Sequence, residues 1–469
     1  MNKPVEKTLE RAVDGIQHKL VEYAHKLRYE DLPKDIVHAA TVRVIDTLGS
    51  LIGGFFAEPC HIARDVAASM PNENGATVIG TRMKTSPEMA AYVNAATARY
   101  VEMNDIYHWP GAFGGHPSDV LTPTLAAAEH AKASGRDFIT GVVLAYEVYQ
   151  SFSDVFRNVG MGFDHTNFCT LGSAVASGKL FGLTSPQLSQ CISLAAVPNV
   201  ILRQVRSDQY SMYKAVASGH AGRAGVFAAI LARAGMEGPH LPFEGKAGWR
   251  DQVARDNFEL SLGGYGAPFK IQHSLIKPRA CCGTTISSVL AAEHISPLRD
   301  LAAVSKITVE VYQKAKERVG TGEHRWNPDT REGADHSIPY VVAATLMDGT
   351  VTPRSFNDAH LWNPELRALI HKIEVVENDE FTKAYIKLPV EHRTRVTVTM
   401  ANGDKLSGEA GGAKDELSAP KTDREIVDKF RMLCEEPLGV RQVDVLLEQL
   451  WKLDRLDDVS VIPPGFVIA

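Results

Sequence analysis

The sequence predicts a mainly α protein, in which a large all-α helical domain is accompanied by a smaller α+β domain. Apolar residues recur at helical spacing from the N-terminus to about residue 265 and again after residue 422. Between these stretches the pattern changes to period-two alternation, which is typical of half-buried strands. A chain of 469 residues is also too long for one hydrophobic core. We therefore expect a helical domain over residues 1–266 and 412–469, interrupted by an α+β domain over residues 267–411.

The helical part begins with two strongly periodic segments. Residues 8–27 carry apolar side chains on one helical face. Pro33 is expected to begin a second helix, which Gly53 and Gly54 end, as glycines at helix C-termini do. The run over residues 215–235 is rich in Ala and Gly, and such helices are usually central because they let neighbours approach closely. Further helices are expected over residues 59–70, 86–103, 120–134, 137–157, 169–182 and 185–196.

Strand and turn patterns place the α+β domain between the helical stretches. Period-two alternation predicts strands, and Asn402-Gly403 is a strong signal for a hairpin turn between two of them. Residues 411–421, with Gly, Ala, Lys, Ser and Pro, make a natural linker to a helical tail. The expected strands cover residues 306–312, 371–376 and 394–410, the helices between them 337–347 and 364–370, and the tail helices 423–433 and 440–453.

Composition and charge exclude several classes of function. With 44% hydrophobic and 23% charged residues, the chain is an ordinary globular protein. A formal charge of −6 leaves no basic field for nucleic acid or an anionic membrane, and no apolar run reaches the length of a membrane span. A local pocket of Lys, Arg and His can still bind a small anionic substrate. The N-terminal Met-Asn-Lys-Pro-Val-Glu-Lys lacks the apolar core of a signal peptide, so a cytoplasmic location is expected.

The cysteines and the known cofactor motifs give no sign of a metal or nucleotide site. The six cysteines show no CxxC pair and no zinc spacing. Adjacent Cys281 and Cys282 are expected to be buried small hydrophobes rather than a disulfide, which favours a reducing compartment. The sequence also lacks a Gly-rich phosphate loop, a Gly-x-Ser-x-Gly elbow and an HExxH motif. We therefore expect no cofactor and no metal.

Residues 101–119 carry more chemistry than a connector between helices requires. They contain Glu102, Asp105, two histidines, a tyrosine, a tryptophan and three glycines. Long ordered loops in compact domains are usually functional, whereas the plainer alternative is a surface loop whose acids cap the flanking helices. The segment beginning at His116 raises the same choice, between a histidine held rigidly by the following proline and a set of capping residues.

Basic side chains gather at the ends of the later helical segments. His165 stands at an expected helix N-terminus, where the dipole lowers the pKa of an imidazole and leaves a neutral base or donor; a structural histidine is the alternative. Arg203, Arg206 and Lys214 lie at the edge of the Ala-rich helix, where cations are costly unless something anionic meets them. An anionic substrate is one answer, and a structural ion pair is the other. Lys277 raises the same question at the domain boundary.

Asp335, His336 and Tyr340 stand between an expected strand and an expected helix, and they offer a tyrosine hydroxyl beside a histidine and an acid. Scattered His, Lys, Asp and Tyr side chains without a metal motif suggest proton-transfer chemistry on a carboxylate-bearing substrate. The residues alone lead no further than this class of reaction.

Several motifs, in order and over nearly the full length of the chain, resemble those of the MmgE/PrpD family, the cofactor-free 2-methylcitrate dehydratases and their relatives. One such motif would be weak evidence, but the set is specific. The matching segments are Asn104-Asp105, Gly115-His-Pro-Ser-Asp119, Arg157-Asn-Val-Gly-Met-Gly-Phe-Asp-His165, Lys214 with Ala217-Ser-Gly219, Lys277 in its Leu-Ile-Lys setting, and Ala334-Asp-His-Ser-Ile-Pro-Tyr-Val-Val-Ala343.

The resemblance implies a helical domain built from both chain ends, an inserted lid-like α+β domain, a homodimer and an active site in the cleft between the domains. The sequence departs from the family at two positions. Glu102 stands where Asp is common, and Thr285 stands where many members have a His eight residues after the motif lysine. The catalytic residues that the resemblance implies are Glu102 or Asp105, His116, His165, Lys214, Lys277 and Tyr340.

We therefore expect a lyase that eliminates water from a hydroxy tricarboxylate such as 2-methylcitrate, as in propionate catabolism, by metal-free general acid and base catalysis. Within the family the alternatives are a cis-aconitate decarboxylase or an iminodisuccinate epimerase. From another class, the alternative is an inactive paralogue that binds di- or tricarboxylates. The base and the acid are expected among His116, His165, Glu102 and Asp105. The residues expected to hold the substrate are Lys214, Lys277, Arg203, Arg206, Asp335 and His336.

Overall fold

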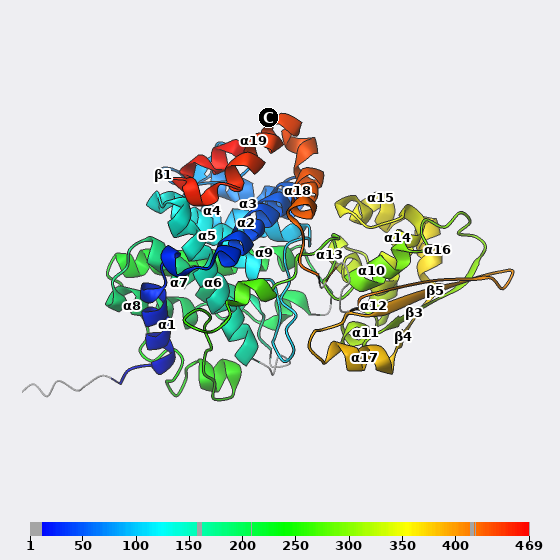
Figure 1. Cartoon of the computed structure of the whole chain (residues 1–469), viewed down its shortest axis with the longest axis horizontal. Helices are drawn as coiled ribbons and strands as arrows, with labels where there is room; N and C mark the ends of the chain where they lie inside the picture. The colour runs from blue at the N-terminus through cyan, green and yellow to red at the C-terminus, as the bar shows by residue number, and fades with distance from the viewer. Residues whose placement is uncertain (1–11, 157–161, 208, 413–416, 418, 469) are drawn as a thin grey trace, which may run out of the picture.

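The computed structural model describes residues 12–468 except 157–161, 208, 413–416 and 418. Within the described residues the protein is mainly helical, with one two-stranded and one four-stranded sheet, which confirms the predicted mainly α class. Figure 1 shows the helices of the first half of the chain on one side of the molecule and strands β3 to β5 on the other. The first five residues of the Arg157–His165 motif and part of the expected linker lie outside the described residues.

The helices of the first half agree closely with the expected segments, because their apolar faces and their caps coincide. Ser134 and Thr184, for example, each accept a backbone N–H of the helix that follows them. The helices are α1 (Gly15–Lys26), α2 (Lys34–Gly54), α3 (Glu58–Ala68), α4 (Pro87–Tyr100), α5 (Leu121–Ala131), α6 (Gly135–Val155), α7 (Thr166–Leu180), α8 (Ser185–Ala196) and α9 (Tyr213–Arg233).

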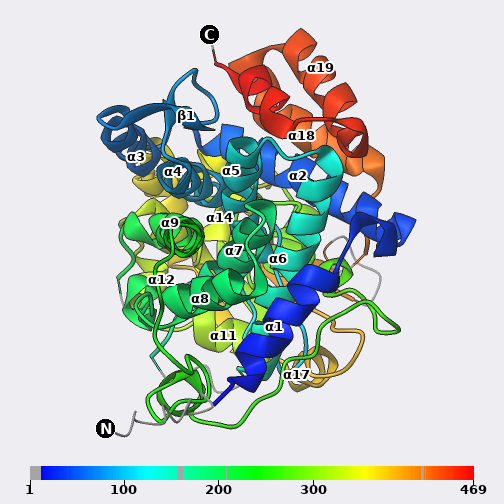
Figure 2. The same cartoon turned by 90° about the vertical axis from the view of Figure 1, so that its left-hand side faces the viewer.

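The Ala- and Gly-rich helix α9 is central, as its composition predicts. It packs against both α4 and α7, and the three lie together in Figure 2. A Cβ on Gly219 would lie only 2.4 Å from the carbonyl oxygen of Tyr92, and one on Gly225 only 2.6 Å from that of Thr170. Small residues at these positions are therefore what allows the backbones to approach.

The second half of the chain builds a four-stranded sheet with helices around it. The strand order is β4-β3-β5-β6, with β3 parallel to β4 and antiparallel to β5. The predicted hairpin at Asn402-Gly403 joins β5 to β6, and Gly403 has the positive φ that such turns require. The elements are α10 (Ile286–Glu293), β3 (Val304–Val311), α11 (Gln313–Val319), α12 (Glu323–Trp326), α13 (Arg331–Ala334), α14 (Ile338–Asp348), α15 (Asp358–Leu361), α16 (Pro364–Ile370), β4 (Ile373–Glu377), α17 (Asp379–Tyr385), β5 (Thr394–Met400) and β6 (Lys405–Ala410).

The C-terminal tail packs against the N-terminal half of the chain. Helices α18 (Asp423–Leu438) and α19 (Val440–Leu450) both contact α2, as Figure 1 also shows. The ammonium of Lys429 on α18 lies 2.5 Å from an Asp46 carboxylate oxygen on α2. Both chain ends thus meet in the helical part, while the boundaries at residues 266 and 411 remain predictions.

Two features of the helical part differ from the sequence patterns. Strands β1 (Pro71–Thr77) and β2 (Lys84–Thr85) form a small antiparallel sheet where no strand was expected, since the polar segment Asn-Glu-Asn-Gly lacks alternation. Helices α2 and α9 are long and apolar enough to cross a membrane, although no span was expected. Their apolar windows are 83% and 67% buried, which is what core helices show.

Candidate active site

A cavity of about 190 Å³ lies between the helical part and the α+β part of the molecule. Four arginines and four histidines line it, and no Asp or Glu is among its described lining residues. Such a lining gives a positive field in a partly enclosed space, which suits a small anion with more than one carboxylate. The basic lining residues are Arg99, Arg203, Arg206, Arg318, His108, His116, His165 and His336.

His116 lies where the loop after α4 turns into a short 3-10 helix, Pro117–Val120. Its Nδ1 is 2.7 Å from the Asp105 carbonyl oxygen, which only accepts, so Nδ1 carries the proton. Its Nε2 therefore has a free lone pair and accepts a hydrogen bond from Arg99 Nη2 at 2.7 Å. Burial, together with the charges of Arg99 and Lys277, lowers the pKa of His116 well below its usual range. His116 is thus a neutral imidazole with its basic nitrogen fixed at Nε2.

His165 is fixed in the opposite way by Tyr149. The Tyr149 oxygen accepts the backbone N–H of His116 at 3.0 Å, so its own hydrogen is free to go to His165 Nδ1, 3.0 Å away. This assignment places the His165 proton on Nε2. The predicted low pKa of His165 is found, but its first cause is burial rather than the helix dipole. The two rings lie 5.5 Å apart; Nε2 of His116 is unprotonated and accepts from Arg99, whereas Nε2 of His165 carries the proton.

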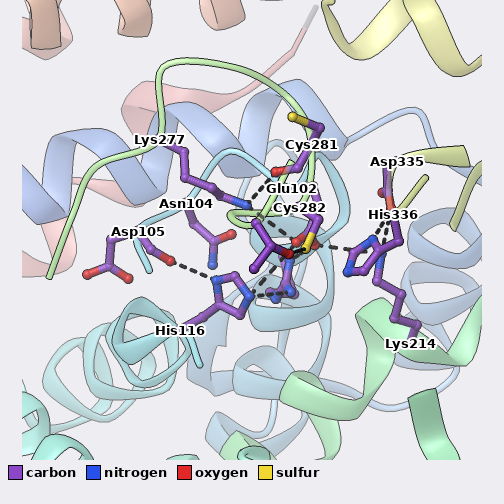
Figure 3. A network of polar contacts seen from close by, with 12 residues as sticks. Glu102, Asn104, Asp105, His116, Lys214, Lys277, Cys281, Cys282, Asp335 and His336 are labelled. Atoms are coloured by element: carbon purple, nitrogen blue, oxygen red, sulfur yellow. Dashed lines mark hydrogen bonds and ion pairs between the residues drawn. The ribbon is translucent and has the colours of Figure 1, made fainter. Parts of the chain in front are cut away.

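Glu102 connects the basic residues behind the cavity, as Figure 3 shows. Its buried carboxylate forms an ion pair with Arg99 and lies 3.3 Å from Lys277 Nζ, 3.8 Å from Lys214 Nζ and 3.8 Å from His116 Nε2. The backbone of Glu102 has a φ of 58°, a left-handed conformation that a non-glycine residue seldom adopts. The surrounding ion pairs hold it there, and such strain concentrates at functional sites.

The two lysines differ in what they contact. Lys214 Nζ lies 2.9 Å from Asp335 Oδ1 and 3.0 Å from His336 Nδ1, so it is held within an ionic cluster. Burial opposes ionisation of Asp335, but the nearby cations outweigh it and lower the pKa of this carboxyl. Lys277 is fully buried, and burial followed by repulsion from Arg99 lowers its pKa well below the usual value.

Arg203 and Arg206 reach the cavity from the short 3-10 helix Arg203–Arg206. Asp164 orients both, at 3.3 Å from Arg203 Nη1 and 2.8 Å from Arg206 Nε. Nη2 of Arg206 has no hydrogen-bond partner among the described residues, although it is buried. A buried donor without a partner is costly, and an anionic group in the cavity would satisfy it.

Asp119 lies behind Arg99 and is almost completely buried. Its Oδ1 is 3.7 Å from Arg99 Nε, and its Oδ2 has no hydrogen-bond partner among the described residues. Burial raises the pKa of Asp119 to about 7, against the opposing effect of Arg99 and Arg206. The carboxyl is therefore poised to titrate near neutrality.

Of the seven predicted catalytic residues, His116 and His165 line this cavity, Glu102, Lys214 and Lys277 lie behind it, and Asp105 and Tyr340 make other contacts. The Asp105 carboxylate accepts the Ser118 N–H at 2.9 Å and the Tyr146 O–H at 3.0 Å, so it holds the His116 turn in place. Tyr340 donates its hydroxyl to the Ser355 carbonyl oxygen at 2.8 Å, away from the residues that line the cavity. Both positions carry family motifs, and their catalytic roles stay predictions of those motifs.

Several residues that line or support the cavity were missed by the sequence analysis. Arg99 ends an apolar helix and resembles an ordinary C-terminal cation, while Arg318 lies in an unremarkable charged helix, α11. Cys282 was expected to be a buried small hydrophobe; instead it is partly exposed and lines the cavity. Thr285, where the family often has a histidine, donates its hydroxyl to the Cys282 carbonyl and precedes α10.

The described residues contain no group of three His, Cys, Asp or Glu side chains placed to hold a metal ion. The six cysteines are all free thiols. Metal-free catalysis stays a prediction of the sequence.

Comparisons with known proteins agree with the motifs over both halves of the chain. The model for the MmgE/PrpD N-terminal domain matches residues 18–261, and that for the MmgE/PrpD C-terminal domain matches residues 280–453. The 2-methylcitrate dehydratase of Salmonella typhimurium is 27% identical over 479 residues, covering 94% of each chain. The cis-aconitate decarboxylase of Homo sapiens is 24% identical over 454 residues, covering 93% of this chain and 92% of its own. The cis-aconitate decarboxylase of Aspergillus terreus is 25% identical over 490 residues, covering 96% and 95%. The chain belongs to the MmgE/PrpD family.

Proposed function

We propose that the protein is a lyase that eliminates water from a hydroxy tricarboxylate of the 2-methylcitrate type. The observation that carries this proposal is the pair of neighbouring histidines, His116 and His165, held as neutral imidazoles in opposite tautomers beside an arginine-lined cavity. Elimination needs a base to remove a proton and an acid to protonate the leaving hydroxide. The dehydratases among the relatives support the same reaction.

The cavity provides binding for the substrate's carboxylates. Arg203, Arg206 and Arg318 reach it from two different parts of the chain, so a tricarboxylate would be held at several points. The unpaired Nη2 of Arg206 marks one of these points. Fixed cations also stabilise the negative charge that develops when a proton is removed beside a carboxylate.

His116 is assigned the role of base. In the free protein its Nε2 lone pair is occupied by Arg99. A substrate carboxylate competes for Arg99, and the lone pair then becomes free to accept the substrate proton. The Glu102 carboxylate, 3.8 Å from Nε2, stabilises the imidazolium that forms.

His165 is assigned the role of acid, because its proton is on the nitrogen that Tyr149 does not occupy. Protonation of the hydroxyl by His165 Nε2 lets it leave as water. As the Nε2 proton leaves, Nδ1 takes the hydroxyl proton of Tyr149, 3.0 Å away, so the ring stays neutral and the negative charge passes to the Tyr149 oxygen.

Proton NMR in heavy water tests these assignments with 2-methylcitrate, citrate and cis-aconitate. His116→Gln removes the base, so the rates of deuterium exchange and of elimination should both fall on the order of 10² to 10⁴-fold. His165→Gln should retain exchange at the acidic carbon and lose elimination. His130→Gln, a matched change on a histidine outside the cavity, should leave both rates unchanged. Unchanged elimination in His116→Gln would overturn the assignment of the base.

Decarboxylation of cis-aconitate is the second candidate, because the human and Aspergillus terreus relatives with that activity cover nearly the whole chain. Here His165 would deliver its proton to carbon as CO2 leaves. Release of CO2 from cis-aconitate, with no unsaturated product formed from 2-methylcitrate, would favour decarboxylation. Deuterium exchange with inversion of configuration would favour epimerisation. Binding of a tricarboxylate without exchange would indicate an inactive paralogue.

The cofactor-free reaction, the homodimer and the cytoplasmic location belong to the same proposal. Activity should survive treatment with a chelator, and light scattering of the purified protein should give twice the mass of one chain. Loss of activity with the chelator would contradict cofactor-free catalysis.

A further inference from the structure

Cys282, His336 and Asp335 form a connected group at the wall of the cavity. Cys282 and His336 both line the cavity, where the charge of His336 acts on the Cys282 thiol, and the thiol lies 3.0 Å from the Thr284 hydroxyl oxygen. His336 Nδ1 in turn hydrogen-bonds Asp335 Oδ1, which also accepts from Lys214. The backbone N–H of Cys282 donates to the Asp335 carbonyl at 2.9 Å, so both residues keep fixed positions.

This order of groups is the one that activates a nucleophile. A base lies within hydrogen-bond reach of the nucleophile, and a carboxylate orients the base. Burial opposes ionisation of the thiol, but His336 and Thr284 outweigh it and lower the pKa of Cys282 well below its usual value. Neighbouring Cys281 provides the contrast, because burial raises its pKa to about 12. Only one of these adjacent cysteines therefore has a reactive setting.

The surroundings of Cys282 also determine which electrophiles are drawn to its sulfur. The cavity that it lines contains Arg99, Arg206 and Arg318. An electrophile that carries a carboxylate would be concentrated beside the sulfur, whereas a neutral one would not. The cavity opens between the two parts of the molecule, so such a compound has access to it.

We propose that Cys282 is a nucleophilic thiolate that adds covalently to α,β-unsaturated carboxylates bound by the arginines of the cavity. The inference rests on the proposed function for the class of compound, because eliminating water from a hydroxy carboxylate leaves an unsaturated one.

The addition is balanced without an oxidant or a second substrate. His336 takes the thiol proton, and Sγ forms a bond to the β carbon. The π pair moves to the α carbon, which the adjacent carboxylate and the arginines stabilise, and His336 returns the proton to that carbon. The adduct is a thioether that fills the cavity, so accumulated unsaturated acid would inhibit the enzyme until the addition reverses.

Alkylation with two matched reagents tests the reactivity and the selectivity. Iodoacetate carries a carboxylate and iodoacetamide does not, while both lose iodide to a thiolate. In the native protein we expect iodoacetate to label Cys282 on the order of tenfold faster than iodoacetamide, located by peptide mapping. Arg318→Gln should reduce this preference, and citrate should protect Cys282. Labelling of other cysteines first, or no preference for the anionic reagent, would overturn the proposal.

Fumarate tests the addition itself, by mass spectrometry of the intact protein. Wild-type protein and Cys281→Ser should gain the mass of one fumaric acid, and Cys282→Ser should gain none. His336→Gln should move the pH profile of labelling upwards, a change that a merely structural histidine would not cause. If a variant does not fold, peptide mapping of the wild-type adduct still decides the position.

The outcome separates this proposal from the proposed function. Turnover of a tricarboxylate with an unreactive Cys282 would refute the thiolate and leave the lyase in place. A Cys282 that reacts with iodoacetamide but is not protected by any tricarboxylate, in a protein without turnover, would refute the lyase.

Discussion

Asp119→Asn removes a buried carboxyl that titrates close to neutral pH. Asp119 lies beneath Arg99, with one carboxylate oxygen lacking a hydrogen-bond partner among the described residues. The amide of Asn has nearly the same shape and carries no charge at any pH. The substitution therefore isolates the effect of ionisation from that of packing.

The magnitude follows from the pKa. Folding raises the pKa of Asp119 from its ordinary 3.8 to about 7, so the folded protein holds the proton at pH values where the unfolded chain has lost it. Stability from this group is fully present below the unfolded pKa and falls as pH rises towards the folded pKa. The interval is about three pH units at about 1.4 kcal/mol each, so the ionised carboxyl costs about 4 kcal/mol. Relative to the wild type, Asp119→Asn should gain about this much stability between about pH 4 and about pH 8.

Two measurements check the prediction. Infrared spectra of wild type minus variant should contain the C=O stretch of a protonated carboxyl, which disappears with a midpoint of about pH 7. Urea unfolding of both proteins across the same pH range gives the stability difference. Asp65→Asn, at an exposed position on α3, should show no such pH-dependent gain. A carboxyl band that titrates near 3.8, or a stability difference independent of pH, would refute the reasoning.

Three further substitutions probe the network around the cavity. Glu102→Gln leaves buried cations without their counter-charge and should cost about 3–5 kcal/mol of stability in urea unfolding; an unaltered midpoint would show that the ion pairs are not formed. Tyr149→Phe removes the hydroxyl that fixes the His165 tautomer and should lower kcat on the order of tenfold or more, with little change in KM, in steady-state assays; an unchanged kcat would contradict the role of His165. Tyr340→Phe loses only the hydrogen bond to the Ser355 carbonyl and should cost about 1 kcal/mol of stability while kcat/KM stays at the wild-type value; a large loss of activity would place Tyr340 in catalysis after all.

The local patterns of the chain were sufficient to predict most helices and strands. The caps of α6 and α8 and the Asn402-Gly403 turn are short-range features, and each is visible in a few consecutive residues. The small sheet of β1 and β2 was not predictable in this way. Its backbone pairing is supported from elsewhere, since the Thr77 N–H and hydroxyl both donate to the buried carboxylate of Glu129.

The candidate site was predictable only where a motif carries it. His116, His165 and Glu102 stand in segments whose composition marks them, whereas Arg99 becomes significant only through Glu102 and His116. The second half of the chain brings Arg318 to the same cavity from more than a hundred residues beyond Arg206. Such long-range proximity is a property of tertiary packing, and it cannot be predicted from spacing along the chain. Motif membership also does not show where a hydroxyl points, since that of Tyr340 donates to the Ser355 carbonyl oxygen.

The left-handed backbone at Glu102 limits which amino acids that position can accept during evolution. Glycine, asparagine and aspartate tolerate a φ of 58° better than glutamate does, but only the acids neutralise Arg99, Lys214 and Lys277. A drift to glycine or asparagine would relieve the backbone and remove the negative charge that Arg99 and Lys277 face, while Lys214 would keep its ion pair with Asp335. Exchange between aspartate and glutamate is therefore the one route that keeps the charge, and it shifts the carboxylate by the length of a methylene group. Relatives that differ at this position would differ in how tightly the cations are drawn together, which gives the family a way to adjust the site without changing its set of charges.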